Sequence, residues 1–134
     1  RFTYAERGLI KLRDLGEYWE ETFRLPIPLG GIVIRADIDA EVQQKVNRVM
    51  QRSVQFALEN PEQTMDYVRP HAQEMEEAVM QQHINLYVND FTVDLGEVGK
   101  TAVQTMFEVA RQKKVIPEFD SPIFVHPPLI AKDK

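Results

Sequence analysis

The sequence has no cysteine, and no apolar run approaches the roughly 18 residues needed to span a membrane. The lack of cysteine excludes disulfide bonds and thiolate-bound metals, and a chain without disulfide bonds is typical of a cytosolic protein. Positive charge is also scarce: residues 36–134 hold sixteen Asp/Glu against ten Lys/Arg, and the whole chain has a net charge of -5. A nucleic-acid phosphate backbone would be repelled by such a surface, so no nucleic-acid partner is expected.

The chain also lacks an initiator methionine and a signal-peptide pattern, since it begins Arg1-Phe2-Thr3-Tyr4. We therefore expect it to be a piece of a longer protein. Its 134 residues, 43% of them hydrophobic, are one domain's worth. A domain of that length buries roughly two thirds of its unfolded surface.

Helix signals dominate from residue 39 onward. Asp39 is expected to cap a long helix, which ends where Asn60-Pro61 both stops it and starts the next one. Further helices are predicted to end near residue 68 and to cover about 76–88 and 97–113, with an extended tail over 115–134.

Two segments share the tetrapeptide Asp-Leu-Gly-Glu, at 14–17 and 94–97. In each, the aspartate can cap a helix and the glutamate three positions on can reach back to the cap.

The long helix has apolar residues at helical spacing. The residues expected to face a core are Val42, Val46, Val49, Met50, Phe56 and Ala57. Those left mostly for solvent are Gln43, Lys45, Arg48 and Arg52.

Strands are predicted at only two places. Leu9, Ile10 and Leu12 form a short apolar run, and Ile32, Val33 and Ile34 are expected to form a strand buried on both faces. A buried strand needs neighbours for its backbone groups. Because this chain offers few, we expect the sheet to be built mostly by residues that precede Arg1, making the chain the second half of an α/β protein.

Residues with catalytic or metal-binding chemistry form no recognisable motif. His71, His83 and His126 lack ligand spacing, and a structural or solvated role is favoured for each. The acid pairs 20–21 and 76–77 point in different directions on a helix and are expected to be solvated. Trp19, with Tyr18 and Phe23, could line a cleft, but residues at this spacing more often belong to a core, and a core role is expected. The sequence contains no nucleophile elbow, phosphate loop or dinucleotide-binding glycine motif.

The stretch LPIPLGGIVIRAD contains the most suggestive feature, a turn with two prolines and the pair Gly30-Gly31 ahead of an apolar run. Glycines at the mouth of a strand let a ligand approach the backbone closely, although a tight loop would use the same residues.

Taken in order, RFTY, GLIKLRDLGEYWEE, LPIPLGGIVIRAD, YVRPHAQEM and HINLYVNDFTVDLGEVG resemble the C-terminal half of the 1,4-dihydroxy-6-naphthoate synthase family. The resemblance covers about residues 1–110. It implies a two-lobed fold like that of type II periplasmic binding proteins, working in the cytoplasm. On this basis residues 1–36 would be the end of one lobe, the hinge turn and a buried strand, and 37–134 the helical part of the other lobe with its tail.

The resemblance also implies a lyase of menaquinone biosynthesis that splits cyclic dehypoxanthine futalosine, with no metal or organic cofactor. The family's proposed base is a histidine in a His-Glu-Ser segment directly before the Arg-Phe-Thr-Tyr motif, so no catalytic residue is expected within this chain. The substrate-binding residues carried over are those of the proline-glycine turn: Pro28, Leu29, Gly30 and Gly31.

Three alternatives remain open at this point. Chorismate dehydratase of the same pathway shares the fold, and a ligand-binding protein of that fold would bind a small acid without turnover. A helical interaction module would show an exposed apolar patch or a repeat of roughly 30 to 45 residues. No such period is present. Self-association of the chain through an exposed strand edge is also expected.

Overall fold

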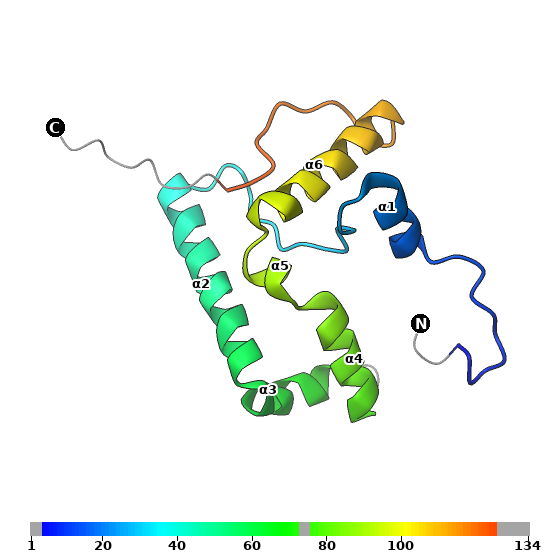
Figure 1. Cartoon of the computed structure of the whole chain (residues 1–134). Coiled ribbons are helices and arrows are strands. Elements are labelled where there is room, and N and C mark those ends of the chain that lie inside the picture. Colours follow the sequence, from blue (N-terminus) through cyan, green and yellow to red (C-terminus); the bar gives the residue numbers. More distant parts are fainter. Residues whose placement is uncertain (1–3, 73–75, 126–134) are drawn as a thin grey trace.

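The computed structural model describes residues 4–72 and 76–125, which are mostly helical (Figure 1). In chain order the helices are α1 (Leu15–Phe23), α2 (Ala40–Glu59), α3 (Pro61–Val68), the 3₁₀ turn η1 (Arg69–His71), α4 (Glu77–Tyr87), α5 (Asp90–Val93) and α6 (Gly96–Gln112). No strand occurs within the described ranges. The predicted helices are confirmed to within a residue or two of their bounds, whereas α5 and η1 were not predicted.

Asp14 and Asp39 are the N-caps of α1 and α2, as the sequence predicts, whereas the N-cap of α6 is Leu95 and not the predicted Asp94. Asp39 Oδ1 accepts hydrogen bonds from the N–H groups of Glu41 and Val42 at 2.9 and 3.3 Å. The two copies of Asp-Leu-Gly-Glu use the same bond: Asp14 Oδ1 accepts from Gly16 N at 2.8 Å, and Asp94 Oδ1 accepts from Gly96 N at 2.7 Å. Each carboxylate satisfies backbone donors that have no partner within the helix.

The corner between α2 and α3 is built differently from the prediction. Pro61 opens α3 as expected, but the Asn60 side chain forms no capping bond to α3. Its Nδ2 group instead donates to the carbonyl of Phe56 at 2.9 Å, closing the end of α2. After α3 the chain continues through Pro70 as one 3₁₀ turn, because proline is tolerated where its missing N–H is not needed.

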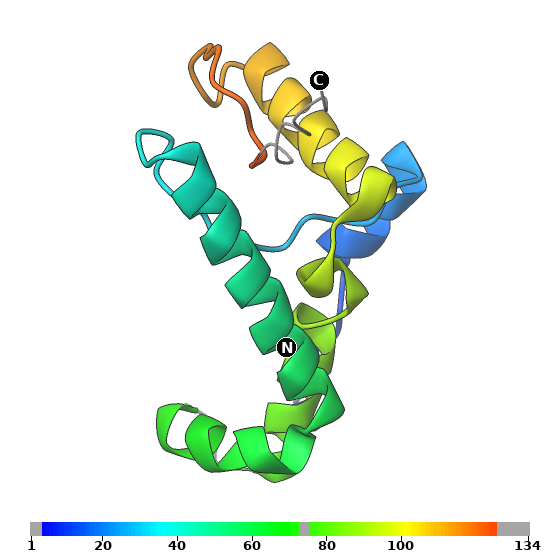
Figure 2. The same ribbon diagram turned by 90° about the vertical axis from the view of Figure 1, so that its left-hand side faces the viewer.

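The short helix α5 links α4 to α6 and lies against α2 (Figure 2). It begins with a capping box in which Asn89 Oδ1 accepts from the Phe91 N–H at 3.0 Å and Thr92 Oγ1 accepts from the Asn89 N–H at 3.1 Å. At the start of α6, Gly99 is buried against Phe91 and Leu95. Farther along, Phe107 packs edge-on against Phe119 from the segment after α6, with ring centroids 5.6 Å apart.

Both strand predictions are wrong for the described chain. Leu9, Ile10 and Leu12 lie in an irregular segment and are exposed. Ile32 and Val33 are 75% and 90% exposed on an extended stretch without a sheet partner. Extended backbone becomes a strand only when a neighbour accepts and donates its hydrogen bonds, and the described residues supply none here.

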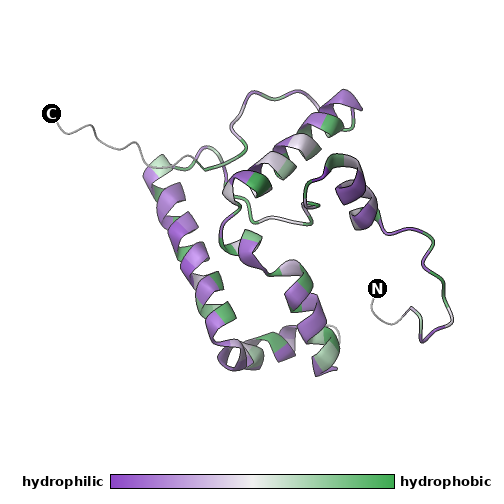
Figure 3. Ribbon diagram, viewed as in Figure 1, coloured by the Kyte–Doolittle hydropathy of each residue, from purple (hydrophilic) through white to green (hydrophobic). Residues whose placement is uncertain are grey.

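Much of the chain's apolar surface is uncovered. The accessible surface is 11524 Å², whereas a compact monomer of 15.6 kDa exposes about 7,200 Å². The chain thus buries roughly half of its unfolded surface, less than the two thirds expected from its length. Among the described residues, the hydrophobic side chains that are buried are Met65, Met80 and Ala102. Figure 3 shows apolar and polar residues interspersed along α2. Most residues of this helix are exposed.

Within the described residues, no helix combines the length and the hydropathy that a membrane span requires.

Candidate functional site

The segment from Leu25 to Ile34 contains the predicted proline-glycine turn and runs between α5 and α6 in both ribbon views (Figures 1 and 2). Its first part is held by α1. Arg24 ends α1 in a left-handed conformation, its N–H donating to the Glu20 carbonyl at 2.9 Å. The Ile27 side chain then lies against α1 at Gly16, where an added Cβ would be only 3.5 Å from Ile27 Cγ2. The residues from 25 to 28 are half-buried as a consequence.

Helix α1 is itself steadied by exposed charge pairs. Lys11 Nζ lies 2.9 Å from Glu17 Oε1, and Arg13 Nη2 lies 3.1 Å from Glu21 Oε2. The hydrogen bond to Glu17 raises the pKa of the Lys11 ammonium above its ordinary value. The second acid pair of the sequence behaves similarly, since Glu77 meets Arg69 at 3.4 Å. Glu21 and Glu77 are therefore surface ion-pair partners, in keeping with the solvated role predicted for the acid pairs 20–21 and 76–77. Glu17, which the sequence predicts to reach back to the Asp14 cap, pairs with Lys11 instead.

The far end of the segment is fixed by polar contacts. The Arg35 guanidinium donates two hydrogen bonds to the Asp37 carboxylate, one from Nε to Oδ1 at 2.9 Å and one from Nη2 to Oδ2. Gln43 Nε2 of α2 donates to the Ile38 and Ala36 carbonyls at 2.7 and 3.3 Å. Gln43 is half-buried by this role, so its predicted place in solvent is wrong. The segment is thus held at both ends while its middle is uncovered.

That middle, residues 29–33, offers backbone groups rather than reactive side chains. It is exposed, and within the described chain its N–H and C=O groups make no hydrogen bond. Neither Gly30 nor Gly31 has a left-handed backbone, and an added Cβ on either would meet no described atom within 4 Å. What glycine contributes here is therefore the lack of a side chain, which leaves the backbone open to an approaching ligand.

The histidines lie elsewhere. His71 ends η1 with its ring 4.7 Å from that of Tyr67, and His83 on α4 stacks on Tyr87 with ring centroids 6.0 Å apart. Both contacts are exposed aromatic pairs, in keeping with the structural role predicted for these two residues. His126 lies outside the described residues.

The aromatic residues of α1 pack partly as predicted. Trp19 and Phe23 are half-buried with ring centroids 4.2 Å apart, while Tyr18 is 51% exposed beneath the Arg13 guanidinium. The Trp19 Nε1 group is buried and has no hydrogen-bond acceptor in the described structure. A buried indole N–H ordinarily finds an acceptor, so this donor is an exception among the buried side-chain polar atoms of the described residues.

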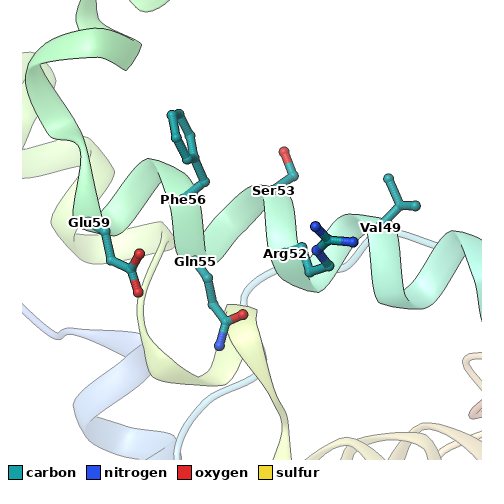
Figure 4. Close-up of a pocket in the computed structure, with 6 residues that line it drawn as sticks. All are labelled: Val49, Arg52, Ser53, Gln55, Phe56 and Glu59. Atoms are coloured by element: carbon teal, nitrogen blue, oxygen red, sulfur yellow. The ribbon is translucent and has the colours of Figure 1, made fainter.

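A shallow hollow lies along α2, and no residue of the turn is among those that line it (Figure 4). Its lining comes from this one helix: Val49, Arg52, Ser53, Gln55, Phe56 and Glu59. Because ligand pockets enclose most of their ligand with several elements, a hollow on a single helix is an uncovered face. Nor do the described residues include a group of three or more His, Asp or Glu side chains able to hold a metal ion.

Comparison with known proteins links this arrangement to one enzyme family. A family model described as "Menaquinone biosynthesis" matches residues 1–112. A Thermus thermophilus protein named 1,4-dihydroxy-6-naphthoate synthase is 41% identical over 125 residues, covering 93% of this chain and 46% of the relative. A Streptomyces coelicolor protein of the same name is 46% identical over 117 residues, covering 87% of this chain and 42% of the relative.

The fold of the chain is also present in a crystal structure of an Archaeoglobus fulgidus protein. The two match with a TM-score of 0.77 at 35% identity over 85% of this chain and 43% of that one. In all three comparisons, this chain spans less than half the length of the protein it matches.

Proposed function

Because the chain belongs to the menaquinone biosynthesis family, we propose that it is part of a lyase that splits cyclic dehypoxanthine futalosine and releases 1,4-dihydroxy-6-naphthoate. The observation that carries this proposal is the pair of 1,4-dihydroxy-6-naphthoate synthases that are 41% and 46% identical to it. They favour this reaction over that of chorismate dehydratase. The complete enzyme would be a cytoplasmic protein with the two-lobed fold of periplasmic binding proteins and would need no metal or organic cofactor.

In this enzyme the proline-glycine turn, Pro28, Leu29, Gly30 and Gly31, forms part of the substrate pocket between the lobes. Three features support the assignment: the turn is held at both ends, its backbone groups are unpaired within the described chain, and its glycines leave room for a flat ligand. Backbone N–H groups there would donate to oxygens of the substrate and orient it.

The base that removes a proton comes from a part of the enzyme that this chain does not span. His71 and His83 each pack on a tyrosine two helices or more along the chain from the turn, and neither adjoins it. A positioned base contributes about 10² to 10⁴ in rate. The 134-residue chain by itself should therefore show no turnover.

The test uses the full-length enzyme that contains this segment. Gly30→Val should raise the KM for cyclic dehypoxanthine futalosine by about tenfold, equivalent to a loss of roughly 1.4 kcal/mol of binding. Since the space around Gly30 is open, the variant should fold normally by circular dichroism. The matched control is Ala36→Val, an exposed position just beyond the turn, which should leave KM unchanged.

An unchanged KM in Gly30→Val would remove the turn from the pocket but leave the reaction assignment standing. A parent enzyme that binds the substrate without converting it would instead favour the non-catalytic binding protein.

A further inference from the structure

Gln43, in the first turn of α2, makes a contact that the helix itself does not need. Asp39 already caps α2 by accepting hydrogen bonds from its first N–H groups, and the Gln43 N–H donates to the Asp39 carbonyl at 2.9 Å as in any helix. The Gln43 side chain reaches back along the chain instead, and its Nε2 group donates to carbonyls that precede the helix. These bonds therefore hold the incoming segment and not the helix.

Both bonds go to one closed turn, residues 35–38. The Nε2 atom of Gln43 lies 2.7 Å from the Ile38 carbonyl oxygen and 3.3 Å from that of Ala36. An amide nitrogen carries two N–H donors, one for each of these carbonyls. Within the turn, the Ile38 N–H donates to the Arg35 carbonyl at 3.3 Å. Gln43 thereby joins a turn with a hydrogen bond of its own to the start of α2.

Residues 35–38 are the second of two anchors for the proline-glycine turn. The whole segment runs from α1 to the start of α2 in light blue (Figure 1), and its first anchor is Ile27, which packs on α1. Between the anchors, the backbone groups of residues 29–33 make no hydrogen bond within the described chain. Backbone that makes no bonds of its own keeps its conformational freedom unless its ends are fixed. Gln43 therefore helps to set where the N–H groups of the proline-glycine turn point.

We infer that Gln43 is a positioning residue of the substrate pocket: by holding residues 35–38 on α2, it orients the backbone of the proline-glycine turn toward the substrate. This inference rests on the proposed function, in which the turn binds the substrate and the base comes from elsewhere. Loosening the turn should weaken substrate binding and leave proton transfer unaffected, which raises KM at constant kcat. A role in folding alone would lower the apparent kcat, because less enzyme is folded, while the folded molecules keep the parent KM.

The test compares Gln43→Met with the parent in the full-length enzyme. Methionine keeps the length of the side chain and a high helix propensity but has no N–H donor, so the two carbonyls lose their partner. The KM for cyclic dehypoxanthine futalosine should rise about three- to tenfold with kcat unchanged. Gln43→Glu, which places an acceptor against the same carbonyls, should raise KM further. Gln55→Met and Gln55→Glu, at an exposed position of the same helix, are the matched controls and should keep the parent KM.

Hydrogen exchange followed by mass spectrometry gives a readout on the full-length enzyme that does not depend on the reaction. The peptide covering residues 29–38 should exchange at least about threefold faster in Gln43→Met than in Gln55→Met, because the turn at 35–38 opens more often. Equal exchange in the two variants would overturn the positioning role whether or not the parent converts the substrate.

The kinetic outcomes separate this inference from the proposed function. An unchanged KM in Gln43→Met beside a raised KM in Gly30→Val would overturn the role of Gln43 and keep the turn in the pocket. A lowered kcat with the parent KM would overturn it as well, because it would identify a role in folding alone. A parent enzyme that converts no substrate would refute the proposed reaction, and the exchange measurement would still decide whether Gln43 holds the turn.

Discussion

Gly99 on α6 is the position where a single added carbon tests the packing most directly. It is buried in the first turn of the helix, at the junction with α5. A Cβ placed there would lie 3.1 Å from Leu95 Cδ2, 3.2 Å from Leu95 Cβ and 3.2 Å from Phe91 Cδ1. Ordinary van der Waals contacts between carbons are nearer 3.5–4.0 Å.

Two opposing effects set the outcome of Gly99→Ala. Replacing glycine in a helix interior stabilises by about 1 kcal/mol. Leu95 is the N-cap of α6, and its Cβ cannot withdraw without moving the backbone. Overpacking of this kind costs about 1–3 kcal/mol. We therefore expect a net loss of about 0–2 kcal/mol for alanine.

Gly99→Val adds two more carbons at the same contact and forgoes most of the helix gain, because a branched side chain is restricted in a helix. It should lower the free energy of unfolding by about 2–3 kcal/mol. Urea unfolding followed by circular dichroism measures both variants, and Gln104→Val, at an exposed position of α6, controls for the branched side chain alone. If Gly99→Val and Gln104→Val proved equally stable, the tight packing at this junction would be refuted.

Two further outcomes follow from local contacts. Asp39→Ala should lower the free energy of unfolding by about 1 kcal/mol because α2 loses its N-terminal cap. Asp39→Ser should keep most of that stability because a serine hydroxyl can also cap a helix. Equal urea midpoints for the two variants would count against the cap. Hydrogen bonds from Arg35 lower the pKa of Asp37, so the stability that this pair contributes is present at neutral pH and is lost as pH falls through the lowered pKa. An NMR titration should show the Asp37 carboxyl moving to a higher pKa in Arg35→Met, and an unmoved value would contradict the contact.

The helix starts could be predicted from the sequence alone because they depend on residues two or three positions apart. A carboxylate at Asp14, Asp39 or Asp94 reaches the N–H groups of the next turn whatever the rest of the chain does. A local signal for α5 is also present in the sequence, because Asn89 and Thr92 have the three-residue spacing of a capping box. That signal was missed because α5 is a single turn of four residues.

For the candidate site, the sequence predicts the turn itself but not the contacts that hold it in place. The prolines and glycines of the turn predicted an open, stiff segment. The anchors at Ile27 and Gln43 depend on α1 and α2 folding back onto it, and neither contact has a signature in the local pattern.

What only the tertiary structure decided is which apolar residues are covered. The pattern at residues 32–34 predicts a buried strand, and that of α2 predicts a core face, yet both lie largely exposed. Periodicity records the surfaces that a segment is built to bury, whereas burial itself needs a partner surface brought from elsewhere in the polypeptide. The local sequence therefore determined the helices of this chain, and the contacts between distant segments determined which of their faces are hidden from water.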